Sequence, residues 1–209
     1  MAYNEKQIQI INTAERLFAL KGYDGTSVRD IAEEAGINLA MISYYFGSKE
    51  GLIKAVFEER TNDIAIKIED LLKNTSMSPM EKIYQLIDDY VDRIATKIQF
   101  HKIMFYEQML EKNTFITGLL NDLKKRNTER VATLIQEGRE KGVFKKDIDL
   151  VLLMNTLFGT VTTSFFNKEY YKMFYNMQSQ DTESFNEEFK LRIRNHIKQL
   201  FKALLQNEE

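Results

Sequence analysis

Residues able to do catalytic chemistry are few in this chain and do not form a recognisable set. None of its 209 residues is cysteine, and neither histidine, His101 or His196, has a glutamate three positions before it. The Glu-x-x-His pairs of di-iron helical bundles are therefore absent, as is a glycine-rich phosphate-binding loop. The acids Asp88, Asp89 and Asp92 have the spacing of a solvated helix face. We expect no catalytic residue, no metal site, no cofactor and no enzyme activity.

Binding chemistry is suggested by residues 26–52, TSVRDIAEEAGINLAMISYYFGSKEGL. Ser27 and Asn38 can each cap a short helix, and Gly36 can adopt the left-handed backbone of a tight turn between them. Apolar residues are spaced to form a small core between the two helices: Ile31, Ala35, Ile37, Ile42 and Tyr45. This pattern is typical of a helix-turn-helix, whose second helix enters the major groove of DNA.

The elements around this segment are predicted to be helices. Apolar residues recur with helical spacing over nearly the whole chain, and one proline with nine glycines leaves few hairpin turns. We expect an all-α fold of about nine helices. Residues 1–47 are predicted to form a three-helix domain that holds the helix-turn-helix, and residues 48–209 a larger helical domain. The long helix that starts at Ser48 connects the two domains.

Charge and polarity limit the partners. The chain has 29 basic and 31 acidic residues and a net charge of −2, which excludes binding of nucleic acid by bulk attraction. A few placed donors must act instead. The first residues lack the pattern of a signal peptide, and the uncharged run 150–167 holds seven Asn, Ser and Thr residues, too many for a membrane span. We expect a cytoplasmic protein with no membrane partner.

The sequence resembles the TetR/AcrR family of bacterial transcriptional regulators. The resemblance is carried by Ala14, Phe18 and residues 22–23, 26–32, 36–37, 44–46 and 48–52, with weaker support from 137–144. It implies contacts with an operator in double-stranded DNA at Ser27, Arg29, Asn38, Leu39, Ala40, Met41, Ser43, Tyr44, Tyr45 and Lys49. Ser43 stands where the family commonly has tyrosine, so a frequent phosphate contact is either missing or supplied by Tyr44.

The resemblance also implies an effector site among the middle helices and a homodimer. Residues 1–47 would then be the DNA-binding domain, and residues 48–209 the effector-binding and dimerisation domain. Aromatic and methionine side chains offer apolar walls for a small hydrophobic effector. The predicted effector-binding residues are Phe100, His101, Met104, Phe105, Met109, Phe158, Thr162, Phe165 and Phe166. Two apolar stripes would be left exposed in a monomer, which predicts a dimer interface at Leu153, Leu157, Gly159, Val161, Phe165, Ile193, Ile197, Leu200 and Leu204.

We therefore predict a ligand-responsive transcriptional regulator, a repressor that its effector releases from DNA. One alternative is an all-helical carrier or enzyme that binds a hydrophobic small molecule. Another is a helix-turn-helix interaction module that does not read DNA, an interpretation that the near-neutral first 60 residues and Ser43 leave open. Sequence-specific DNA binding separates these hypotheses.

Overall fold

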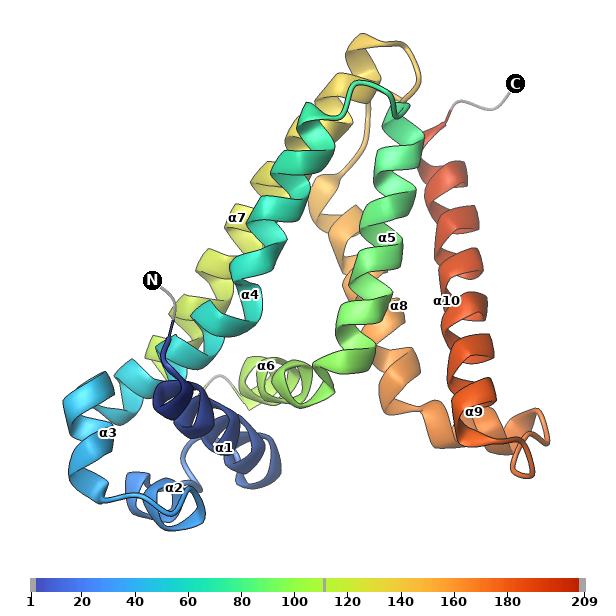
Figure 1. Ribbon diagram of the computed structural model, residues 1–209. Helices are drawn as coiled ribbons and strands as arrows, with labels where there is room; N and C mark the ends of the chain where they lie inside the picture. The colour runs from blue at the N-terminus through green and yellow to red at the C-terminus, as the bar shows by residue number, and fades with distance from the viewer. Residues whose placement is uncertain (1–2, 111, 207–209) are drawn as a thin grey trace. The chain divides into compact units, whose positions relative to one another are not determined.

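The computed structural model describes residues 3–110 and 112–206, and every regular element in those ranges is a helix. The helices are α1 (Glu5–Lys21), α2 (Val28–Glu34), α3 (Leu39–Phe46), α4 (Lys49–Lys73), α5 (Pro79–Thr96), α6 (Ile98–Leu110), α7 (Thr114–Glu140), α8 (Leu150–Phe166), α9 (Lys168–Phe174) and α10 (Thr182–Leu205) (Figure 1). The predicted all-α class is confirmed. The described residues hold ten helices instead of about nine, because the short α9 begins directly after α8.

The chain divides into two compact units. The first comprises the residues up to Ile64 together with Gln99–Lys124, and the second comprises Ala65–Ile98 and the residues from Lys125 onward. Helices α4 and α7 contribute to both units. The first unit extends beyond the 1–47 domain expected from the sequence, since it takes in α6 and the first parts of α4 and α7.

The first unit has one buried core to which six helices contribute. Phe18 of α1 and Ile42 of α3 are each 1% exposed, and Ile53 of α4 is fully buried. Phe100 of α6 and Leu120 of α7 belong to the same core. Burying a large apolar side chain contributes about 1.5–3 kcal/mol. Helices α6 and α7 thus supply stabilisation that the short helices α2 and α3 cannot supply alone.

The second unit is built on the packing of α5, α8 and α10. Ile87 and Val91 of α5, Val161 of α8 and Ile197 of α10 are fully buried. These are the apolar stripes that helical periodicity indicates, and the three helices bury them against one another.

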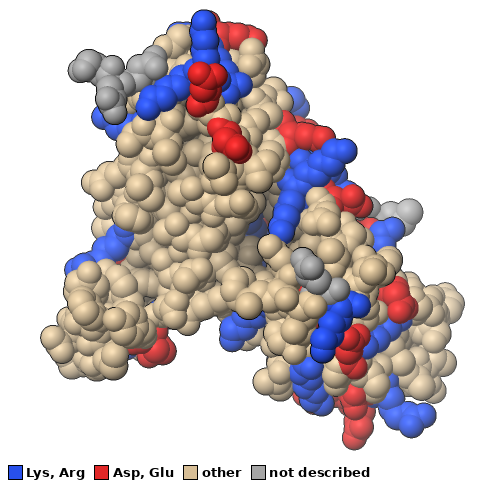
Figure 2. All heavy atoms as spheres, turned by 180° about the vertical axis from the view of Figure 1, so that it is seen from behind, with Lys and Arg blue, Asp and Glu red and all other residues tan. Residues whose placement is uncertain are grey.

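Ion pairs border this packing where α5 meets α10. Asp88 accepts a hydrogen bond from Lys198 at 2.6 Å, and Asp92 pairs with Arg194 and, at 3.7 Å, with Lys190. Two of the three acids predicted to form a solvated face, Asp88 and Asp92, therefore bind basic residues of α10, whereas Asp89 pairs with Lys67 of α4 at 3.6 Å. Seen from behind, the side of α8 and α10 shows a broad surface without charged side chains (Figure 2).

A further ion pair in the second unit is buried. The Lys82 side chain is 1% exposed, and its ammonium donates to the two carboxylate oxygens of Glu137 at 2.8 and 3.0 Å. Lys141, on the solvent side, donates to the same carboxylate at 2.6 Å. Hydrogen bonds from Lys141 and Lys82 lower the pKa of Glu137. Among the described residues, Glu137 is the one carboxylate that pairs with Lys82, so the burial of this lysine depends on Glu137.

Glu137→Ala is expected to lower the free energy of unfolding by about 3–5 kcal/mol, because it leaves a buried ammonium without its partner. Lys141→Ala, which removes only the exposed partner, should cost no more than about 1 kcal/mol. Urea unfolding at pH 7, followed by circular dichroism, measures both values. If both variants lost the same free energy of unfolding, the buried Lys82 charge would not be the reason why Glu137 stabilises the unit.

Candidate nucleic-acid interface

Local signals form the two short helices of the helix-turn-helix. Ser27 caps α2: its hydroxyl accepts the N–H of Asp30 at 3.1 Å, and the Asp30 carboxylate accepts the N–H of Ser27 at 2.8 Å. Asn38 caps α3 by accepting the N–H of Ala40 at 2.9 Å. Gly36 lies between the helices with a φ of +61°, which disfavours a side chain. Both predicted caps and the predicted turn are present.

Helix α1 holds this pair of helices in place. The side-chain amide of Gln9 donates to the carbonyl of Ala35, at the end of α2, at 2.9 Å. Arg16 forms an ion pair with Glu34. The buried hydroxyl of Thr26 donates to two carbonyls at the end of α1. The orientation of α2, and of the turn that leads to α3, therefore depends on α1.

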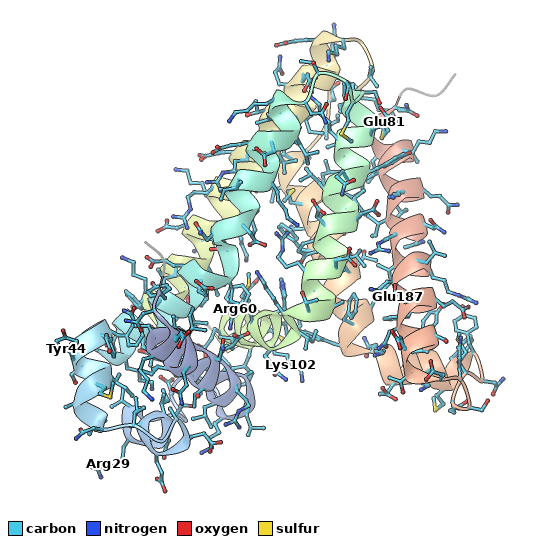
Figure 3. The ribbon with its side chains drawn as sticks, in the orientation of Figure 1. Arg29, Tyr44, Arg60, Glu81, Lys102 and Glu187 are labelled. Atoms are coloured by element: carbon cyan, nitrogen blue, oxygen red, sulfur yellow. The ribbon has the colours of Figure 1, made fainter. Side chains whose placement is uncertain are left out.

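Helix α3 presents an uncharged and largely exposed face. No charged residue lies between Ala35 and Ser48. Tyr44 is 82% exposed and points away from the neighbouring helices (Figure 3). Its ring contacts the ring of Tyr45 edge to face, at a centroid distance of 5.1 Å, and Tyr45 itself packs against the core. The α3 surface can offer apolar contacts and hydroxyl groups to a partner, but no charge.

All ten residues predicted to contact DNA are accessible. Met41, Tyr45 and Lys49 are half-buried, and the exposed ones are Ser27, Arg29, Asn38, Leu39, Ala40, Ser43 and Tyr44. Arg29 projects outward from α2 (Figure 3), and no ion pair joins it to Glu33, although both residues are described. Its guanidinium is therefore available to a phosphate. The contacts of this set with DNA stay a prediction.

Lys49, at the start of α4, has a more constrained position. Its ammonium lies over the ring of Tyr23, 4.0 Å from the centroid, which is a favourable cation–π contact. Burial lowers the pKa of Lys49. Ser48 caps the same helix by accepting the N–H of Gly51 at 3.1 Å. The lysine is thus oriented by an aromatic ring.

The predicted effector-binding residues divide between the two units. On α6, in the first unit, lie Phe100, His101, Met104, Phe105 and Met109; on α8, in the second, lie Phe158, Thr162, Phe165 and Phe166. Phe100 is buried in the core, whereas Met109 is 71% exposed. Phe158 lies 5.1 Å from the ring of Tyr90, whose hydroxyl is 3.3 Å from that of Thr162. Burial raises the pKa of Tyr90 to about 12. An effector role for this set stays a prediction.

Most of the predicted dimer interface is buried inside the chain. Five of its residues are at most 6% exposed: Leu153, Leu157, Val161, Ile193 and Ile197. They cannot form a surface between two chains, because α8 and α10 turn these stripes towards the core that they share with α5. Phe165 and Leu200 are half-buried, and only Gly159 and Leu204 are exposed.

A cavity of about 680 Å³ in the second unit escaped the sequence analysis. It lies between α8, α9 and α10 and is lined by Thr160, Thr163, Ser164, Asn167, Tyr170, Tyr171, Phe189, Arg192, Ile193 and His196. None of the predicted effector-binding residues lines it.

No single helix in the described ranges is long and apolar enough to cross a membrane; α8 and α9 pass such a test only as a pair bent by 69°.

One residue of the first unit was also missed. Glu107 on α6 is 4% exposed and accepts the backbone N–H of Tyr23 at 3.1 Å. In the sequence it follows Phe100 and Ile103 on the same face of the helix. An acid at an apolar position is the signal that would have indicated it.

Comparison with known proteins identifies the family. The family described as bacterial regulatory proteins, tetR family, matches residues 10–56, and the tetracyclin repressor-like C-terminal domain matches residues 79–201. A probable HTH-type transcriptional regulator of Bacillus subtilis, YttP, is 31% identical over 134 residues, which are 64% of each chain. The fatty acid metabolism regulator protein of Bacillus subtilis is 26% identical over 174 residues, 80% of this chain and 88% of that protein.

A solved structure shows the same fold. The transcriptional regulator FadR of Bacillus subtilis, in complex with stearoyl-CoA, has a TM-score of 0.67 at 21% identity, over 94% of this chain and 97% of that one. The second family match alone spans more than half of the chain. The chain belongs to the TetR family of bacterial regulatory proteins, and the predicted family is confirmed.

Proposed function

We propose that this protein is a dimeric repressor that reads operator DNA through α3 and is released from it by a small apolar effector. The observation that carries the proposal is the exposed, uncharged face of α3, from which Tyr44 projects. Along the chain, Arg29 precedes this helix and Lys49 follows it. In helix-turn-helix proteins the second helix reads base edges while flanking groups contact phosphates.

Charged and uncharged side chains have separate tasks in this proposal. Bulk attraction cannot supply affinity at a net charge of −2. Arg29, Lys49 and the backbone N–H groups at the start of α4 would contact phosphates. Leu39 and Tyr44 would contact base edges, with apolar contact to thymine methyl groups.

Dimerisation would place two α3 helices about 34–36 Å apart, in successive major grooves. Because the predicted stripes are buried, we assign the interface to the outward faces of α8 and α10. Exposed apolar residues there are Val151, Leu152 and Leu204, and the surface on this side shows few charged side chains (Figure 2). An apolar face of this kind is typical of contacts between chains.

The effector class is suggested by the relatives together with the chain's own residues. One relative is named a fatty acid metabolism regulator, and a structure of similar fold holds stearoyl-CoA. Within the second unit, the predicted effector-binding residue Phe158 packs against Tyr90, and the hydroxyl groups of Tyr90 and Thr162 meet. A long-chain acyl thioester fits such surroundings better than a small charged metabolite.

DNA binding by the full chain should fall steeply with salt. If each half-site neutralises three or four phosphates, log K should change with log salt at a slope near −6, from about −0.9 per phosphate. Fluorescence anisotropy with a promoter fragment that the purified protein binds, over a range of potassium chloride concentrations, measures the slope. A slope near zero would remove the DNA assignment.

Substitutions on α3 should alter sequence preference, whereas Arg29→Ala should weaken binding to all DNA sequences alike. Leu39→Ala and Tyr44→Ala are expected to change discrimination between the operator and single-base variants by about 1–3 kcal/mol if these residues contact bases. Leu20→Ala is a matched control, since Leu20 is 73% exposed on α1, outside the predicted contacts. Uniform weakening by the α3 variants would contradict base readout.

Stearoyl-CoA should weaken operator binding, and the operator should weaken stearoyl-CoA binding by the same factor, because coupling between two sites is reciprocal. A coupling of about 1–3 kcal/mol corresponds to roughly 5–150-fold. Titration calorimetry with and without operator tests this, with free coenzyme A as the control ligand. If stearoyl-CoA bound tightly and with the same affinity in the presence and absence of operator, this effector mechanism would be ruled out.

A further inference from the structure

An ionisable side chain occupies a core position at the contact between α6 and α1. Phe100, Ile103 and Glu107 follow one another on the inward face of α6, and all three are buried. A carboxylate at such a position is unfavourable unless hydrogen bonds or opposite charge compensate for lost hydration. The groups around Glu107 must therefore compensate for the burial of its carboxylate.

The first compensating contact is with the backbone just after α1. Gly22 caps the C-terminal end of α1, and the next N–H, that of Tyr23, donates to Glu107 at 3.1 Å. The ring of the neighbouring Tyr106 lies over Gly22, so close that a β-carbon there would come within 3.0 Å of it. Two consecutive residues of α6 thus fix the start of the segment that leads to the Ser27 cap of α2.

The second contact runs through the Tyr23 ring to Lys49. The ring carries the Lys49 ammonium on its face at 4.0 Å. Asp24 and Glu50 are the other charged groups near Tyr23. The pKa of Glu107 is raised by burial and by Asp24, and is lowered by the Tyr23 N–H and by Lys49. The backbone bond to Glu107 therefore acts together with packing against Phe18, 5.4 Å between ring centroids, to hold the ring on which the lysine rests.

We propose that Glu107 is a positioning residue for DNA binding: by holding the Tyr23 backbone, it keeps the Tyr23 ring where it directs Lys49 towards phosphate. The inference rests on the proposed function, because it concerns a lysine expected to contact DNA. It makes α6 a working part of the DNA-reading unit, although Glu107 is far from the helix-turn-helix in sequence. No contact between Glu107 and DNA is involved.

The test compares Glu107→Leu with Glu107→Gln in the full chain. Glutamine keeps an oxygen that accepts the Tyr23 N–H, so DNA affinity should stay within about threefold of the wild type. Leucine removes the acceptor and should lower affinity at least tenfold for all DNA sequences. The salt slope should also become shallower by about 1.8, since each of two copies loses one phosphate contact worth about 0.9.

The salt slope separates positioning from a general loss of stability. Glu15→Leu is the matched control: Glu15 is another buried acid of the first unit, paired with Arg60, and its loss should lower the melting temperature without changing the slope. In a Lys49→Ala background, Glu107→Leu should leave the slope unchanged. A wild-type slope in folded Glu107→Leu would overturn the inference while leaving the proposed function intact.

A second variant covers the case in which Glu107→Leu does not fold. Tyr23→Leu removes the ring beneath Lys49 but keeps the N–H that Glu107 accepts, and it should reduce the slope by the same amount. Tyr23→Phe keeps the ring and should not. An unchanged slope in Tyr23→Leu would also overturn the inference, whereas absence of salt-dependent binding in the wild type would instead remove the proposed function.

Discussion

Helices of seven and eight residues cannot stay folded by themselves, and this constraint governs the first unit. Helices α2 and α3 are of this length, below the length at which isolated helices are stable in water. Caps at Ser27 and Asn38 satisfy their first backbone groups, but their orientation needs a larger body. Helix α1 provides it through Gln9 and Arg16, and the core that buries Ile42 is completed by α4, α6 and α7.

The second unit is governed by a different constraint, because each of its three main helices has an apolar stripe that must be buried. Helices α5, α8 and α10 bury those stripes together, and charged residues of α5 and α10 pair along one border. The remaining face of α8 carries threonines, asparagine and exposed leucine, without charge. The unit therefore has one charged side and one uncharged side, and only the uncharged one suits a second copy.

Local features of the sequence were sufficient to predict the helix-turn-helix. Caps act over three residues and a glycine turn over one, so Ser27, Asn38 and Gly36 could be interpreted without knowing the rest of the fold. The partner of an apolar stripe is not a local property. Val161 and Ile197 show the same periodicity whether they face the same chain or another one, and the structure places both inside the chain. The inclusion of α6 in the first unit, and the role of Glu107, depend on contacts across more than 80 residues.

The lack of charge on α3 has a consequence for a cell whose ionic composition changes. In the proposed arrangement the ion-sensitive part of the binding energy comes from residues outside α3, and the part that distinguishes one operator from another comes from uncharged side chains. Osmotic stress would then change the affinity for every target by a common factor and preserve their order of repression. Evolution could likewise exchange Leu39 or Tyr44 to redirect the protein to new genes, without resetting how tightly it holds DNA in general.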